Sequence, residues 1–284
     1  MRRLDRSGFS LVELIVALVV FGIISAAIYG LLTRTQRLSR TQADRAVMQA
    51  NIRSGIGLIT SELREINVNA AQSDILAANA TSITYRAMRG LGFLCDTPTN
   101  TQLVVRRGGY VGYRDPIAGR DSVALFVDGD PDSASDDSWI FLRITSITAG
   151  TCAGGGAALT MVIPGLGSTL PSAIPVGSPL RVYEVMQVGQ MTQGGATWLG
   201  ARTVSGGESA LSPVLGPLAA DGISLRYWNG ASSPSETSNL LNVRTITLTL
   251  RGLTDNIVAA GAGTVAWQQA ADSFTTSIRL RNTP

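Results

Sequence analysis

The clearest pattern in the chain is a continuous apolar run close to its N-terminus. Residues 9–32 form 24 consecutive positions whose single charged side chain is Glu13. An apolar segment of about 20 residues is long enough to cross a bilayer as an α-helix. The pattern therefore predicts a transmembrane helix segment over 9–32, preceded by a short polar stretch over 1–8.

The polar stretch that follows keeps a helical period. Apolar residues recur on one face at intervals of four and three: Ile52, Ile56, Ile59, Leu63 and Ile66. This spacing is typical of an amphipathic helix, and no proline interrupts the chain from 9 to 67. We expect one helix whose continuation over 33–67 packs its apolar stripe on the chain's own globular domain, with a coiled-coil dimer as the alternative. Gly55 and Gly57 either weaken this helix or permit close approach of a strand.

Beyond Asn67 the pattern changes to short runs of alternating apolar and polar residues, separated by Gly, Pro, Ser and Asp, as in antiparallel strands. The segments 205–220 and 229–242 are the best candidates for linkers, but neither has the composition of a domain boundary. The pattern predicts an α+β fold, a long helix on antiparallel β-sheets, with a β-rich globular domain over 68–284. The predicted strands are Ser82–Arg86, Gln102–Arg106, Ser122–Val127, Trp139–Ile147, Ala158–Ile163, Leu180–Val188, Thr197–Thr203, Ile223–Trp228, Val243–Arg251 and Thr276–Arg281.

Composition narrows the possible chemistry. All 23 basic residues are arginine, and the chain contains neither lysine nor histidine. This excludes Ser-His-Asp and Cys-His catalysis, histidine zinc sites, and lysines that bind phosphate or form Schiff bases. Charged residues make up 15%, against about 25% in an average soluble domain. Only carboxylate, hydroxyl, thiol or tyrosine catalysis stays open, and we expect a protein that is not an enzyme and has no cofactor.

The polar stretch 1–8 is basic, which predicts a cytoplasmic N-terminus by the positive-inside bias. Two ordinary interpretations are a signal peptide, with small residues at 25–27 as the cleavage site, and a simple signal anchor. Neither accounts for Glu13, because a carboxylate at the bilayer centre costs about 2.5–3.5 kcal/mol. Cleavage between Gly8 and Phe9 would create a positive amine at nearly the same depth. Two such charges about 4 Å apart attract by ~4 kcal/mol at an effective dielectric of 20.

The residues GFSLVEL, from Gly8 to Leu14, lie between a short basic leader and a long apolar helix. This arrangement resembles the prepilin signal of type IV pilins and type II secretion pseudopilins. The resemblance implies that a prepilin peptidase removes the leader 1–8, that Phe9 becomes N-methylated, and that Glu13 forms the assembly charge pair with the new amine. It also implies a pilin-like fold. Gly30 stands where major pilins of this family often have a helix proline, which fits a minor component.

Two C-terminal segments, 221–228 and 277–282, resemble J-type minor pseudopilins and the similar PilW-like minor pilins. The resemblance implies a tip-located, assembly-initiating subunit of a type II secretion pseudopilus. Its partners would be other pseudopilins and an inner-membrane assembly platform, with a single pass through the inner membrane and a periplasmic globular domain. One alternative is a type IV pilus minor pilin for adhesion, motility or DNA uptake. An alternative of another class is a membrane-tethered extracytoplasmic binding module.

Two further features concern the β-rich part. Cys95 and Cys152 are the only cysteines; in an oxidising compartment they form a disulfide if they meet, and otherwise stay as buried thiols. Asp128, Asp130 and Asp132 have the alternate spacing of calcium ligands, but the loop lacks the glycine and glutamate of an EF-hand. A looser calcium site and a solvated acidic turn are the two interpretations.

Four arginines raise the possibility of a DNA-binding patch: Arg86, Arg89, Arg106 and Arg107. The charge of the mature chain argues against it, because removal of residues 1–8 lowers the net charge from +3 to +1. A nucleic-acid-binding protein usually concentrates basic residues on one face. We therefore expect no nucleic-acid partner.

Overall fold

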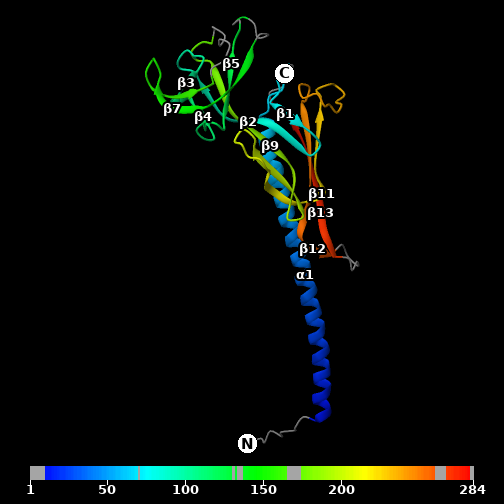
Figure 1. Cartoon of the computed structure of the whole chain (residues 1–284). Helices are drawn as coiled ribbons and strands as arrows, with labels where there is room; N and C mark the ends of the chain where they lie inside the picture. Colours follow the sequence, from blue (N-terminus) through cyan, green and yellow to red (C-terminus); the bar gives the residue numbers. More distant parts are fainter. Residues whose placement is uncertain are drawn as a thin grey trace, which may run out of the picture. The chain divides into compact units, whose positions relative to one another are not determined.

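A single long helix precedes the β-rich part of the chain. The computed structural model describes residues 10–69, 71–129, 132, 137–164, 174–259 and 267–281. Helix α1 runs without interruption from Leu11 to Arg64 (Figure 1). It therefore ends three residues before the predicted limit at Asn67. The predicted start at Phe9 lies outside the described residues.

The strands that follow are arranged in two antiparallel sheets. Of the strands described, ten belong to the larger sheet, whose central order is β1-β2-β9-β10-β11-β12-β13; β4 pairs with β2, and β5 pairs with β9 and β6. The smaller sheet has the order β3-β8-β7. The strand bounds are β1 Ile75–Ala78, β2 Ser82–Phe93, β3 Gln102–Arg106, β4 Val111–Gly112, β5 Ser122–Val127, β6 Ser138–Arg143, β7 Ser146–Thr151, β8 Ala157–Val162, β9 Pro179–Gln193, β10 Ala196–Thr203, β11 Ser212–Trp228, β12 Thr245–Ala259 and β13 Trp267–Arg279.

The period-two pattern of the sequence corresponds to burial in the sheet. On β12, Ile246, Leu248 and Leu250 are buried, whereas the threonines between them are partly exposed. Opposite faces of one strand therefore meet the core and solvent, as the alternation predicts. The α+β prediction, a long helix on antiparallel sheets, is confirmed.

One strand prediction and one linker prediction are wrong in detail. The predicted strand Trp139–Ile147 is two strands, β6 and β7, which belong to different sheets; Ile144 between them is fully buried. The predicted linker 205–220 contains the start of β11, which begins at Ser212. Proline and glycine made this segment look like a loop. The strand accommodates them with irregular pairing to β10 on either side of Leu215, and its later part pairs with β12.

Contacts divide the chain into two compact units. The helix enters the second unit at Asn51, and there the predicted apolar stripe is covered: Ile52, Ile59, Leu63 and Ile66 are buried and Ile56 is partly buried. The chain's own β-rich part therefore covers the stripe. The units are residues 1–50 with 254–270, and residues 51–253 with 271–284.

The two helix glycines have different surroundings. A methyl group at Gly55 would overlap the side chain of Leu215 on β11, whereas a methyl group at Gly57 would meet open space. Gly55 thus permits close approach of a strand, one of the two interpretations of the sequence. Gly57 makes no such approach and only weakens the helix.

The N-terminal segment as candidate functional site

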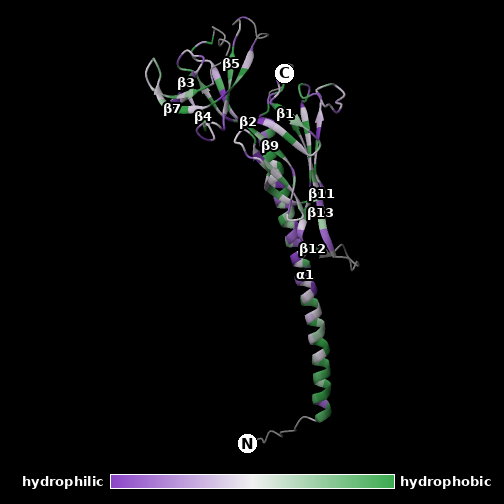
Figure 2. Ribbon diagram, viewed as in Figure 1, coloured by the Kyte–Doolittle hydropathy of each residue, from purple (hydrophilic) through white to green (hydrophobic). Residues whose placement is uncertain are grey.

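The first half of α1 exposes apolar side chains on every face. All side chains from Ser10 to Tyr29 are exposed, and Figure 2 shows this part of the helix as almost continuously hydrophobic. The helix is long and apolar enough to cross a membrane. An apolar surface of this extent marks a region that is covered by lipid or by other protein surfaces.

The helix begins with a reciprocal pair of hydrogen bonds between Ser10 and Glu13. The Ser10 amide donates to the Glu13 carboxylate (3.1 Å), and the Glu13 amide donates to the Ser10 hydroxyl (3.3 Å). This arrangement is a capping box, which satisfies two amides at the start of a helix. The carboxylate also lies at the positive end of the helix dipole. Glu13 therefore has a partner in its own helix, in addition to any amine that cleavage creates.

Sequence reasoning missed this capping role, although the signal is present in the sequence. Ser10 followed three residues later by Glu13 fits the capping-box pattern at a helix start. Gly8 and Phe9 lie outside the described residues. Cleavage between them, methylation of Phe9 and the charge pair with Glu13 stay predictions.

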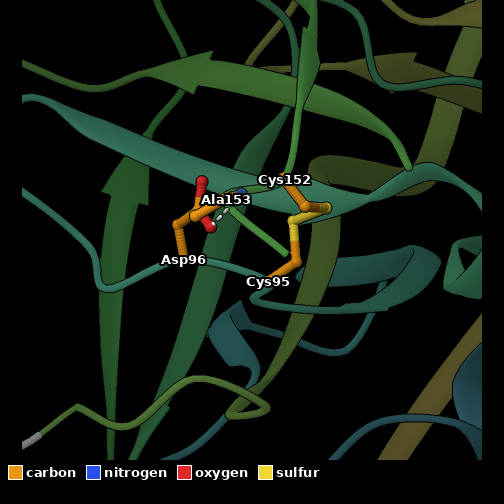
Figure 3. The surroundings of a disulfide bond; sticks show 4 residues. All are labelled: Cys95, Asp96, Cys152 and Ala153. Atoms are coloured by element: carbon orange, nitrogen blue, oxygen red, sulfur yellow. Dashed lines mark hydrogen bonds between the residues drawn. A yellow bond between two sulfur atoms is a disulfide. The ribbon is translucent and has the colours of Figure 1, made fainter. Parts of the chain in front are cut away.

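Cys95 and Cys152 form a disulfide with a Cα–Cα distance of 5.6 Å (Figure 3). Both residues are buried. The bridge joins the segment after β2 to the turn between β7 and β8, and the Ala153 amide donates to the Asp96 carboxylate beside it (2.8 Å). The structure therefore contains the disulfide and not two buried thiols.

The acidic loop yields no cation site in the part of the chain that the structure describes. Asp128 and Asp132 are described, whereas Asp130 lies outside the described residues. Among the described side chains, no group of three carboxylate or cysteine residues is placed to hold a metal ion. Calcium at Asp128, Asp130 and Asp132 stays a prediction.

A buried cluster of arginines and carboxylates centres on Glu184 of β9, which is 3% exposed. Its carboxylate accepts hydrogen bonds from Arg89 Nε (2.5 Å), Arg120 Nε (2.6 Å) and Arg114 Nη2 (3.3 Å). Burial by itself raises the pKa of Glu184, but hydrogen bonds from Arg120 and Arg89 outweigh it and lower this pKa below its ordinary value. Glu184 therefore carries a negative charge in the folded protein at neutral pH.

The cluster extends from Glu184 to helix α1 and to a second buried carboxylate. Arg89 Nη1 lies 3.1 Å from the carboxylate of Glu62 on α1. Arg114 forms two hydrogen bonds to Asp121, which is fully buried and also accepts from the Ile117 amide (2.7 Å). The cluster thus joins the helix to the β-sheet. Sequence reasoning missed it because its members are far apart along the chain.

Three of the four arginines considered for a DNA patch have acidic or aromatic partners. Arg86 lies 3.8 Å above the ring of Phe141, and Arg107 is 2.8 Å from Asp115. Arg89 belongs to the buried cluster. Partners of this kind reduce the positive potential that these side chains offer to a phosphate backbone.

One comparison with known proteins gives a match. Residues 3–29 match the family model described as the prokaryotic N-terminal methylation motif. The matched segment contains Gly8, Phe9, the capping box and most of the exposed apolar helix. No curated protein and no solved structure matches the chain.

Proposed function

We propose that the chain is a pilin-like filament subunit, and more specifically a minor pseudopilin of a type II secretion pseudopilus. It is made as a prepilin and cut between Gly8 and Phe9, and its Phe9 amine is then methylated. One observation carries the proposal. The methylation motif over 3–29 coincides with an exposed apolar helix that begins at Leu11, directly after the proposed cut.

The exposed helix explains how such a subunit passes between two environments. In the inner membrane, lipid surrounds the apolar side chains of residues 11–32; in a filament, the same side chains pack on neighbouring helices. Both environments remove this apolar surface from water. Glu13 supplies the one charge in this segment, and it pairs with the amine of Phe9 in the same or a neighbouring subunit.

The disulfide supports the orientation of the chain in the membrane. The three leader arginines (Arg2, Arg3 and Arg6) predict a cytoplasmic N-terminus, but three arginines closely follow the apolar segment (Arg34, Arg37 and Arg40) and weaken that bias, so a second observation is needed. A structural disulfide persists in an oxidising compartment. We therefore propose a cytoplasmic N-terminus and a periplasmic β-rich domain.

The partners follow from this proposal. A prepilin peptidase removes the leader, an inner-membrane assembly platform extracts the subunit, and other pseudopilins accept it near the filament tip. The absence of histidine and lysine supports a structural subunit rather than an enzyme. The short C-terminal likenesses to J-type pseudopilins and PilW-like minor pilins support a minor subunit, and they do not separate pseudopilus use from pilus use.

N-terminal mass spectrometry of the mature protein tests the proposal. We expect N-methyl-phenylalanine at Phe9 in cells that contain prepilin peptidase, and an uncut chain in cells that lack it. A mature N-terminus at Ile28, or Met1 retained beside an active peptidase, would contradict processing. Cysteine crosslinking to pseudopilins and to type IV pilins, expressed side by side, then separates the two filament types. Correct processing without crosslinks to either would favour the tethered binding module.

A further inference from the structure

A group of arginines on α1 directly follows the apolar segment. Arg34, Arg37 and Arg40 are exposed, and the sequence has no acidic residue between Glu13 and Asp44. The carboxylate of Asp44 accepts a hydrogen bond from the side-chain amide of Asn256 (3.4 Å). The first turns of helix beyond the apolar segment therefore carry positive charge only. We call these three arginines the arginine belt.

Helix geometry places the belt at the depth of the lipid headgroups. The apolar segment 9–32 is about 36 Å long as a helix, at 1.5 Å per residue. This length covers the hydrocarbon core, which is about 30 Å thick. The belt residues lie about 3, 8 and 12 Å beyond Leu32 along the axis and within an arc of about 120°. The polar layer adds about 5–8 Å on each side of the core, and arginine side chains are long enough to reach it.

We propose that the arginine belt binds the phosphate groups of anionic phospholipids in the leaflet next to the β-rich domain. A guanidinium group pairs with phosphate through two parallel hydrogen bonds, and its charge does not depend on pH in the physiological range. Each arginine near an anionic surface strengthens binding by about fivefold. The inference rests on the proposed function only in requiring α1 to span a membrane.

Cleavage of the leader gives the belt a specific role. The cut after Gly8 removes Arg2, Arg3 and Arg6, which are the basic residues on the other side of the apolar segment. After this cut, the belt arginines are the basic residues that remain close to the membrane. It sets the depth of the mature helix, and its lipid contacts break when the subunit is extracted into a filament.

Native mass spectrometry of the full-length protein in detergent tests the belt. Phosphatidylglycerol and phosphatidylcholine are titrated separately, and bound lipids are counted. We expect the native chain to bind phosphatidylglycerol more tightly than phosphatidylcholine. In the triple variant Arg34→Gln, Arg37→Gln, Arg40→Gln this preference should fall about a hundredfold, because each lost arginine contact weakens binding by about fivefold. The matched control is Arg45→Gln. That residue lies about 20 Å beyond Leu32, and screening limits charge interactions to about 8 Å, so the preference stays unchanged.

Three outcomes would overturn the inference. Equal binding of the two lipids would do so, as would an equal loss in the Arg45→Gln control. Unchanged lipid preference in a triple variant that fails to enter filaments would assign the belt to an acidic protein partner instead. Leader cleavage is read separately from the mature N-terminus. An uncut chain that prefers phosphatidylglycerol contradicts the proposed function while it supports the belt.

Discussion

Arg89 Nε lies 2.5 Å from the carboxylate of Glu184, and the same guanidinium reaches Glu62 of helix α1 at 3.1 Å. One side chain of β2 therefore joins the last turn of the helix to β9. Glu184 is almost completely buried and has three arginine partners. The loss of one member of a buried ion pair is costly because the partner charge stays buried and uncompensated.

We predict that Glu184→Gln destabilises the folded chain by about 3–5 kcal/mol, the range for breaking a buried pair. Thermal unfolding of the full-length protein in detergent, followed by circular dichroism, measures the change. The control is Glu236→Gln, which breaks an exposed pair with Arg226 (2.9 Å) and should leave the unfolding midpoint nearly unchanged. Equal shifts in the two variants would contradict a stabilising role for the buried cluster.

The same carboxylate predicts how stability depends on pH. The pKa of Glu184 is lowered from 4.5 in the folded protein, because its hydrogen bonds to arginine outweigh the effect of burial. Its contribution to stability is therefore complete well above pH 4.5, and it is lost as the pH falls through the lower folded pKa. We expect the unfolding midpoint to fall in this acid range, and Glu184→Gln to weaken the dependence. An unchanged slope in the variant would assign the acid sensitivity to other groups.

Burial raises the pKa of Asp74. This carboxylate therefore contributes to the pH dependence of stability with a sign opposite to that of Glu184. The Asp74 carboxylate accepts from the Asn67 amide (3.0 Å) and lies 3.7 Å from Arg86. A raised folded pKa means that the folded state holds this proton more tightly, so the contribution of Asp74 to stability falls as the pH rises through that pKa. Asp74→Asn should therefore steepen the loss of stability in acid.

The two helix glycines form a matched pair for a packing test. Gly57→Ala should stabilise the helix by about 1 kcal/mol, because alanine favours helix and the site is open. Gly55→Ala brings the same helical gain but forces the Leu215 side chain to move, so its net effect should be smaller or destabilising. Thermal unfolding compares the two. Equal stabilisation would show that α1 and β11 do not require close approach at Gly55.

Pattern and composition predicted much of the fold but none of the buried ion cluster. The β12 alternation and the helix stripe were readable because each pattern repeats over several residues with a fixed period. The first part of β11, from Ser212, was missed because local glycine and proline resemble a loop, whereas its later part, Ile223–Trp228, was predicted. The cluster around Glu184 was missed because its members meet only after β2 and β9 have paired, and one sequence carries no signal of that pairing.

The disulfide gives a prediction that does not depend on the ion cluster. Cys95 and Cys152 are 57 residues apart, and a bridge that closes a loop of this length stabilises by about 4 kcal/mol in the chain-entropy model. The double variant Cys95→Ala, Cys152→Ala should lose roughly that amount. Reduction of the native chain should lower its unfolding midpoint, whereas the same reductant should leave the double variant unaffected. A shift in the double variant as well would show that the reductant acts elsewhere.

Two partners of Glu13 need to be separated: Ser10 in the capping box, and the amine that the proposed cleavage would create at Phe9. Glu13→Gln distinguishes them, because glutamine keeps the capping hydrogen bond but removes the charge. We expect Glu13→Gln and Glu13→Ala to insert into membranes normally and to block or slow entry into filaments.

Ser10→Ala is the complementary variant. It removes the hydroxyl that accepts from the Glu13 amide, at a cost to the helix start of about 1 kcal/mol, but keeps the carboxylate. Filament entry of this variant should therefore continue. Filaments sheared from cells and immunoblotted for the subunit give the comparison. Normal entry of Glu13→Gln would show that Glu13 acts by capping its own helix, and the charge pair with Phe9 would be wrong.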